Sequence, residues 1–140
     1  MLARIRYVSE FTNPLSRDQL RELVRVAAER NAEKGITGIL MASGGLFFQI
    51  IEGPPQALET LFEKILQDPR HKNVMLLRKE LPIDERFFPD WAMHPIAFTE
   101  EQEERLEPLK VIMETIFDHY HIINKLTFTL EQGIWREFLE

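Results

Sequence analysis

The order of apolar patterns along residues 2–98 constrains the fold of this chain most strongly. Segments typical of strands occupy 2–9, 36–43, 46–52, 74–81 and 91–98, and apolar stripes with helical spacing follow residues 16 and 54. The order is therefore strand, helix, strand, strand, helix, strand, strand. Two βαβ-type units with an internal hairpin predict an α+β fold, a ferredoxin-like sheet with both helices on one face.

Local signals mark where these elements begin and end. The sequence Ser-Arg-Asp-Gln at 16–19 forms a capping box that starts the first helix, and Gly35 suits the end of that helix. Pro-Pro at 54–55 suits the first turn of the second helix, and Asp-Pro at 68–69 stops it. Ser-Gly-Gly at 43–45 predicts a tight hairpin between the second and third strands.

The charge divides the chain into two parts. Residues 1–98 hold 13 acidic and 13 basic side chains, whereas residues 99–140 hold 10 acidic and 4 basic ones, so the whole net charge of −6 lies in the second part. We therefore predict a domain over 1–98 and a separate helical segment over 99–140.

The C-terminal segment has the spacing of two helices. Its apolar residues recur at intervals of three and four, and Thr-Leu-Glu-Gln at 129–132 predicts the start of a second helix. These apolar residues form a seam of only two heptads. A seam this short favours a helical segment that covers the helix-free face of the sheet over a dimer or signalling helix pair. The seam consists of Leu106, Leu109, Met113, Ile116 and Tyr120.

Several classes of function are disfavoured by what the sequence lacks. There is no cysteine, which removes disulfides, thiolate metal sites and cysteine nucleophiles. The four histidines are scattered, so no metal site is predicted. A neutral body with an acidic end argues against nucleic-acid binding. No apolar run approaches the roughly 18 residues of a membrane helix, and no signal peptide is recognisable, so we expect a cytoplasmic protein without a membrane partner.

Three polar residues stand where the pattern requires apolar ones. Asn31 continues the apolar stripe of the first helix, Gln49 lies between apolar residues on one strand face, and Tyr7 shares its face with Ala3 and Ile5. A buried polar group without a partner costs roughly 1–3 kcal/mol, so three aimed at one volume indicate a shared ligand. Taken singly, Tyr7 could bond to backbone and Asn31 could satisfy the end of its helix.

Five further residues point to the same region less specifically. Trp91 and Met93 alternate onto one face of the predicted fifth strand, where core filling is the simpler interpretation; Pro95 places that strand at an edge. Asp68 ends the stripe of the second helix but also suits its termination, and the following Arg70 and His71 are typical of a solvated loop as well as of a phosphate contact.

Taken together, these segments resemble BLUF domains, blue-light sensors that use FAD, and in particular the short single-domain type. The matching pieces span residues 1 to 98 in family order, and the combined pattern is highly specific. They are Ile-Arg-Tyr-Val-Ser at 5–9, Asn-Ala-Glu-Lys-Gly-Ile-Thr-Gly-Ile-Leu at 31–40, Phe-Phe-Gln-Ile-Ile-Glu-Gly at 47–53, Asp-Pro-Arg-His at 68–71 and Phe-Pro-Asp-Trp-Ala-Met at 88–93.

The resemblance implies a non-covalently bound FAD whose ring lies between the two helices. Asn31 matches the asparagine that binds the polar edge of the ring, and Gln49 matches the glutamine between the ring and the tyrosine, Tyr7. The resemblance further assigns the ribityl or phosphate region to Lys64, Asp68, Arg70 and His71, and a place near the glutamine to Trp91 or Met93.

The resemblance also implies the mechanism, which is proton-coupled electron transfer from Tyr7 through Gln49 after light absorption, with no chemical product and hence no enzyme activity. Because 42 residues leave no room for a catalytic output domain, we expect signalling through a separate effector protein or through a homo-oligomer. The competing hypotheses are a light-insensitive ferredoxin-like interaction module and a small acyl-phosphatase-like enzyme.

Overall fold

The computed structural model describes residues 1–43, 45–96 and 100–138, except for the side chains of 109, 110, 113, 114, 121, 124 and 134–138. It divides into two compact units, Met1–Thr99 and Glu100–Glu140. Gly44, the middle of the predicted hairpin turn, lies outside the described residues. The first unit contains β1 (Leu2–Phe11), α1 (Arg17–Glu33), β2 (Thr37–Ser43), β3 (Leu46–Gly53), α2 (Pro55–Gln67), β4 (His71–Ile83) and β5 (His94–Ile96).

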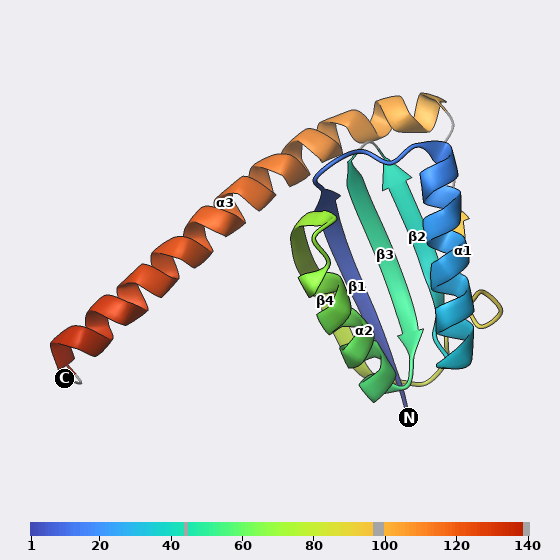
Figure 1. Ribbon diagram of the computed structural model, residues 1–140, viewed down its shortest axis with the longest axis horizontal. Helices are drawn as coiled ribbons and strands as arrows, with labels where there is room; N and C mark the ends of the chain where they lie inside the picture. The colour runs from blue at the N-terminus through green and yellow to red at the C-terminus, as the bar shows by residue number, and fades with distance from the viewer. Residues whose placement is uncertain (44, 97–99, 139–140) are drawn as a thin grey trace. The chain divides into compact units, whose positions relative to one another are not determined.

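The strands form one sheet in the order β4-β1-β3-β2-β5. The pairs β1–β3, β1–β4 and β2–β3 are antiparallel, and only the edge strand β5 runs parallel to its neighbour, β2. Figure 1 shows α1 and α2 on the same face of this sheet. The predicted α+β, ferredoxin-like fold is therefore confirmed.

Both helices begin and end at the predicted signals. The Ser16 hydroxyl accepts a hydrogen bond from the Gln19 backbone N–H, and Gln19 Oε1 accepts one from the Ser16 backbone N–H, which completes the capping box. Gly35 follows α1 with a φ of 69°, a left-handed conformation that glycine adopts without a steric penalty. Pro55 stands at the start of α2, and Asp68 caps its end.

The core of the first unit lies between the helices and the sheet. Each central strand contributes alternate residues to it, so that Ile5 of β1 and Ile51 of β3 are almost completely buried. Leu58 and Leu61 of α2 close the core from the helix side, and Val24 does so from α1. These layers hold the two helices over the strands that carry Tyr7 and Gln49.

The predicted bounds of β1, β2 and β3 are within two residues of those observed, and the largest differences are in β4 and β5. β4 begins at His71 instead of 74, because the ten-residue β1 pairs with it over its whole length, from Phe11 opposite His71 to Leu2 opposite Ile83. β5 is shorter than the predicted 91–98: its parallel pairing with β2 begins only at His94, so Trp91 and Met93 lie in the preceding loop. Its edge position is confirmed.

The second unit is one helix, α3 (Glu100–Phe138), which corrects the prediction of two helices. The predicted helix start at 129–132 does not occur. The Thr129 hydroxyl instead donates to the Lys125 carbonyl, four residues earlier, as it does inside a continuous helix. Leu109 and Met113 of the predicted seam have side chains outside the described ones. That this segment caps the sheet remains a prediction. Among the helices described, none is long and apolar enough to cross a membrane.

Gly38 is required by the close approach of β2 to β3. A Cβ atom at this position would clash with the Ile50 carbonyl oxygen. We expect Gly38→Ala to lower the free energy of unfolding by about 2–3 kcal/mol, measured by urea denaturation. Gly45→Ala is the control, since a Cβ there meets only the Phe11 oxygen at an ordinary 3.8 Å. Equal stability of the two variants would contradict this account.

Candidate functional site

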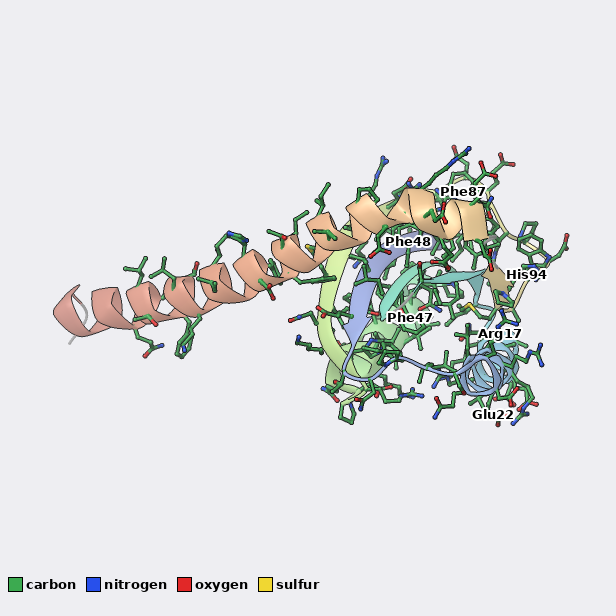
Figure 2. All side chains as sticks on the ribbon, turned by 90° about the horizontal axis from the view of Figure 1, so that it is seen from above. Arg17, Glu22, Phe47, Phe48, Phe87 and His94 are labelled. Carbon is green, nitrogen blue, oxygen red and sulfur yellow. The ribbon has the colours of Figure 1, made fainter. Side chains whose placement is uncertain are left out.

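A cavity of about 610 Å³ lies between α1, α2 and the sheet. Figure 2 shows the neighbours Phe47 and Phe48 of β3 on opposite faces of the sheet, with Phe47 on the side of α1. The cavity wall is mixed, with apolar side chains around a small number of polar ones. The polar or aromatic residues from the sheet and from the ends of the helices include Tyr7, Ser9, Asn31, Phe47, Gln49, Lys64, Asp68, Arg70 and His71.

Tyr7 and Gln49 occupy opposite positions of the β1–β3 pair, so both side chains lie on the helix face of the sheet. Both are almost completely buried. The Gln49 amide donates through Nε2 to the Met93 sulfur at 3.4 Å, and the Tyr7 ring lies 5.6 Å from the Phe62 ring. A phenol and an amide therefore meet in the cavity wall.

Asn31 lines the cavity and has an unsatisfied side-chain oxygen. The residue is 1% exposed, and its Nδ2 donates to the Ala92 carbonyl at 2.9 Å. Its Oδ1 has no hydrogen-bond partner. The end of α1 is satisfied by the Asn31 backbone carbonyl, which accepts from Lys34 and Ile36, and not by the side chain. A buried acceptor of this kind is usually hydrogen-bonded, and a ligand in the cavity can supply the donor.

Burial determines the protonation state of Tyr7. Removal from water raises the pKa of its phenol well above the usual value; Arg30 opposes this shift and Asp68 adds to it. The phenol is therefore neutral at physiological pH and keeps a proton that it can donate.

The rim beside the end of α2 is charged. Asp68 accepts hydrogen bonds from the Arg70 backbone at 2.9 Å and from its Nε at 3.0 Å, and this contact with the Arg70 side chain lowers the pKa of the carboxyl. His71 packs edge-on against Phe11 at 4.4 Å, and its Nδ1 has no partner. Lys64 lines the cavity from the last turn of α2.

The two residues before β5 have opposite environments. Met93 is 7% exposed and touches Gln49, whereas Trp91 is 39% exposed and its ring stacks between Phe88 and His94. The prediction that both alternate on one strand face is therefore wrong, because neither belongs to β5. The structure brings Met93, and not Trp91, to the amide. A role for Trp91 in the relay remains a prediction.

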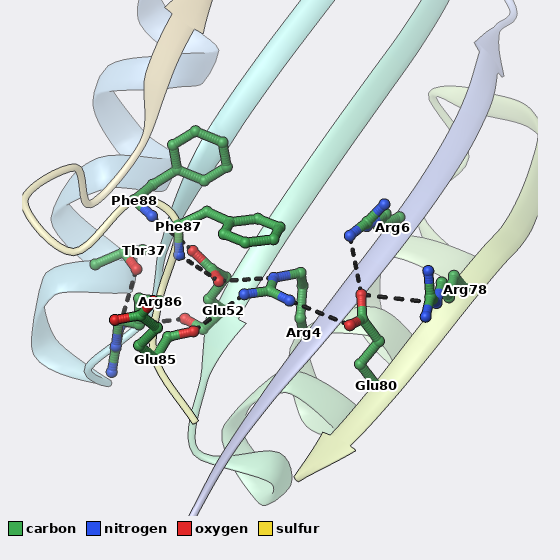
Figure 3. A network of polar contacts seen from close by, with 10 residues as sticks. All are labelled: Arg4, Arg6, Thr37, Glu52, Arg78, Glu80, Glu85, Arg86, Phe87 and Phe88. Carbon is green, nitrogen blue, oxygen red and sulfur yellow. Dashed lines mark hydrogen bonds and ion pairs between the residues drawn. The ribbon is translucent and has the colours of Figure 1, made fainter. Parts of the chain in front are cut away.

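An ion pair between Arg4 and Glu52, which sequence patterns did not predict, lies outside the cavity (Figure 3). Both side chains point to the sheet face opposite the helices, and both are buried. The available signal was the charged residue that ends the apolar run of β3, opposite an arginine of β1.

The residues around the cavity fit a flavin. The cavity volume lies in the range usual for cofactor sites, and its walls combine apolar surface with few polar groups. The unpartnered Asn31 oxygen fits the donor edge of the ring, and the unpartnered Ser9 hydroxyl and His71 nitrogen offer further hydrogen bonds. The site thus has the form expected of a flavin-binding protein.

A family model described as "Sensors of blue-light using FAD" matches residues 2–94. The chain therefore belongs to the BLUF family of blue-light sensor domains, whose cofactor is FAD.

Similar proteins include light-regulated adenylate cyclases and a smaller BLUF protein. The photoactivated adenylate cyclase subunit beta of Euglena longa is 39% identical over 116 residues, which make up 82% of this chain and 13% of that protein. The structure of a bacterial light-regulated adenylyl cyclase matches with a TM-score of 0.71 and 36% identity, over 89% of this chain and 36% of the other. The dark-state structure of the BLUF protein BlrB matches with a TM-score of 0.63 and 36% identity, over 76% of this chain and 79% of the other.

The burial of His71 predicts that the folded protein loses stability in acid. Desolvation lowers the pKa of its imidazole below the usual value, so the unfolded chain binds the proton more readily than the folded one. The contribution of His71 to the free energy of unfolding is therefore complete above a pH of about 6.5, which is the pKa of the imidazole in the unfolded chain. This contribution decreases as the pH falls below that value. We expect the melting temperature to decrease less between pH 7.5 and 5.5 in His71→Gln than in the unmodified protein. An identical decrease would contradict the assignment.

Proposed function

We propose that the chain is a blue-light photoreceptor in which Tyr7, Gln49 and Met93 form a light-dependent hydrogen-bond switch beside non-covalently bound FAD. The observation that carries the proposal is the convergence of a neutral phenol, an amide and the unpartnered Asn31 oxygen on one cavity. Membership of the BLUF family supports the cofactor and favours this function over the interaction module and the acyl-phosphatase-like enzyme.

Bound FAD supplies blue absorption and, once excited, a strong one-electron oxidant. Tyr7 is the phenol in the cavity wall, and we assign the donated electron to it. Loss of an electron makes the phenol a strong acid, so its proton leaves toward Gln49, its opposite neighbour on β3. Both electron and proton return to Tyr7, which leaves no chemical product and makes the cycle reversible.

Gln49 retains the effect of the transfer because its two ends differ. One end of the amide accepts hydrogen bonds and the other donates them, so a rotated or tautomeric amide presents the opposite character to the cavity. We expect this exchange to shift the absorption to the red. It also changes the contact between Gln49 Nε2 and the Met93 sulfur, through which we propose that the change reaches the segment before β5.

The remaining cavity residues hold the cofactor. We assign Asn31 to the polar edge of the ring, where its oxygen accepts a hydrogen bond. The charged rim then faces the neutral ribityl chain and the phosphate groups, and the anionic phosphates suit cationic side chains. It consists of Lys64, Asp68, Arg70 and His71.

We further propose that residues 99–140 form the output segment and that its target is a separate effector protein or a second copy of the chain. The excess of acidic residues in this segment, 10 against 4 basic ones, favours a basic surface on the partner. Light-dependent output also requires an element with two arrangements that the switch biases.

An absorption spectrum before and after blue light tests the function directly. The full chain, supplied with FAD, is expected to be yellow, to shift to the red on illumination and to return in the dark. A colourless protein, or a yellow one whose spectrum light leaves unchanged, would reject the photoreceptor assignment. The interaction module and the enzyme are both expected to be colourless.

A further inference from the structure

We infer that Glu52 is a positioning residue of the light switch, one that anchors the β4–β5 loop (residues 84–93) and thereby holds Met93 against Gln49. This inference rests on the proposed function and deepens it, because it assigns a role to a side chain that neither faces the cavity nor takes part in the proposed electron and proton transfer. Glu52 lies only three residues from Gln49 on β3, but on the opposite face of the sheet.

The Glu52 carboxylate is fully buried, and both of its oxygens accept hydrogen bonds. Its Oε2 accepts from Arg4 Nε at 2.8 Å and from the Phe87 backbone at 2.9 Å, and its Oε1 accepts from the Phe88 backbone at 2.8 Å (Figure 3). Two consecutive amides of the β4–β5 loop are therefore fastened to one side chain of β3. A buried carboxylate is tolerated only with such charged and polar partners.

Arg4 fastens the same part of the loop from the other side. Its Nη2 donates to the Glu85 carbonyl at 3.0 Å, and its guanidinium lies 3.5 Å from the centroid of the Phe87 ring. Arg86 adds hydrogen bonds to the Thr37 hydroxyl at 2.9 Å and to the Gly35 carbonyl at 2.8 Å. The first half of the loop is thus held on the sheet by buried or partly buried charges.

The second half of the loop carries the contact to the switch. The Trp91 carbonyl accepts from the Gly38 backbone at 2.8 Å, and the Ala92 carbonyl accepts from Asn31 Nδ2 at 2.9 Å. Met93 then accepts from Gln49. Only four residues separate Phe88 from Met93, so a displacement at the Glu52 anchor is transmitted to the sulfur over a short, hydrogen-bonded segment.

Glu80 provides a matched control within the same network. It accepts from Arg4 Nη1 at 3.2 Å and from Arg6 Nη2 at 3.0 Å, but among the hydrogen bonds of the described residues it receives none from the loop amides. Glu80→Gln and Glu52→Gln each remove one negative charge from beside Arg4. Only Glu52→Gln also affects the anchor, because a glutamine has a single acceptor oxygen and must turn an NH2 group toward one of the two loop amides.

The first test uses the flavin-free chain and methyl-labelled methionine, with the Met93 signal assigned by its loss in Met93→Leu. We expect Glu52→Gln to shift or broaden the Met93 signal and to raise amide exchange at Phe87 and Phe88 roughly tenfold, while Glu80→Gln leaves both at the unmodified values. Equal behaviour of the two variants, in either direction, would overturn the anchor.

The second test uses the FAD-bound chain. We expect Glu52→Gln to change the rate of dark recovery after blue light roughly fivefold, and Glu80→Gln to leave it within about twofold. Unchanged recovery in Glu52→Gln would overturn its role in the switch. If the unmodified chain itself shows no light response, the proposed function fails, whereas the methionine signal still decides whether Glu52 anchors the loop.

If Glu52→Gln does not fold, the double variant Arg4→Met with Glu52→Leu replaces it. Exchange of both partners for apolar side chains leaves no unpaired charge between them, and such exchanges often preserve stability. The double variant still removes both acceptors of the Phe87 and Phe88 amides. The same change in the Met93 signal and in dark recovery is expected, and unmodified values for both would reject the inference.

Discussion

Gln49→Leu is expected to bind FAD and to lose the light-induced red shift. Leucine has a similar size but carries neither donor nor acceptor, so no rotation of this side chain can change the hydrogen bonds offered to the cavity. The substitution also removes a buried polar group together with its bond to Met93, so we expect a change in unfolding free energy of only about 1 kcal/mol in either direction. Difference absorption spectra under blue light measure the effect.

Met93→Leu is the control for this substitution. It removes the sulfur that Gln49 contacts but leaves the amide itself in place. We expect this variant to keep the red shift and to change only the rate of dark recovery. A normal red shift in Gln49→Leu would reject the amide as the switch, whatever the Met93 variant does.

Tyr7→Phe is expected to bind FAD yet fail to form the stable lit state. The substitution removes only the hydroxyl, so packing against Phe62 is preserved and the stability cost stays near 0.5–1.5 kcal/mol. What disappears is the acidic proton that a phenol releases when it loses an electron. Without it, the Gln49 amide has no partner from which to receive a proton, and the red-shifted spectrum does not develop after illumination.

The chain contains one other tyrosine, Tyr120 in α3, which provides a matched control. Tyr120→Phe is expected to retain the full light response. If Tyr7→Phe still forms a stable lit state, the electron donor is another side chain. Loss of that state in the double variant Tyr7→Phe with Trp91→Phe would then identify Trp91 as the donor. Retention of the lit state in the double variant would reject both residues.

The architecture of the first unit was predictable because its signals are local. Alternation along β1 and β3 predicts which residues face the helices, and this places Tyr7 and Gln49 on the cavity side. The capping box at Ser16 and the left-handed Gly35 mark the ends of α1, so the position of Asn31 near its last turn follows as well. Each of these features depends on neighbours within a few residues.

The segment between β4 and β5 was not predictable in this way. Trp91 and Met93 have the spacing of a strand, but strand pairing with β2 begins only at His94, a register set by residues more than fifty positions away. The different environments of the two side chains, with Met93 buried and Trp91 stacked near the surface, follow from that register. No local pattern distinguishes them.

The amino-acid sequence alone therefore determined the order of the elements, the faces of the strands and the three polar groups that meet in the cavity, because these depend on periodicity and on short-range caps. Tertiary structure alone decided that Met93 contacts Gln49 and that Glu52 is buried with Arg4 behind the sheet. Both depend on the path of a loop across distant strands, and the burial of a charge becomes favourable only where that path brings its partners together.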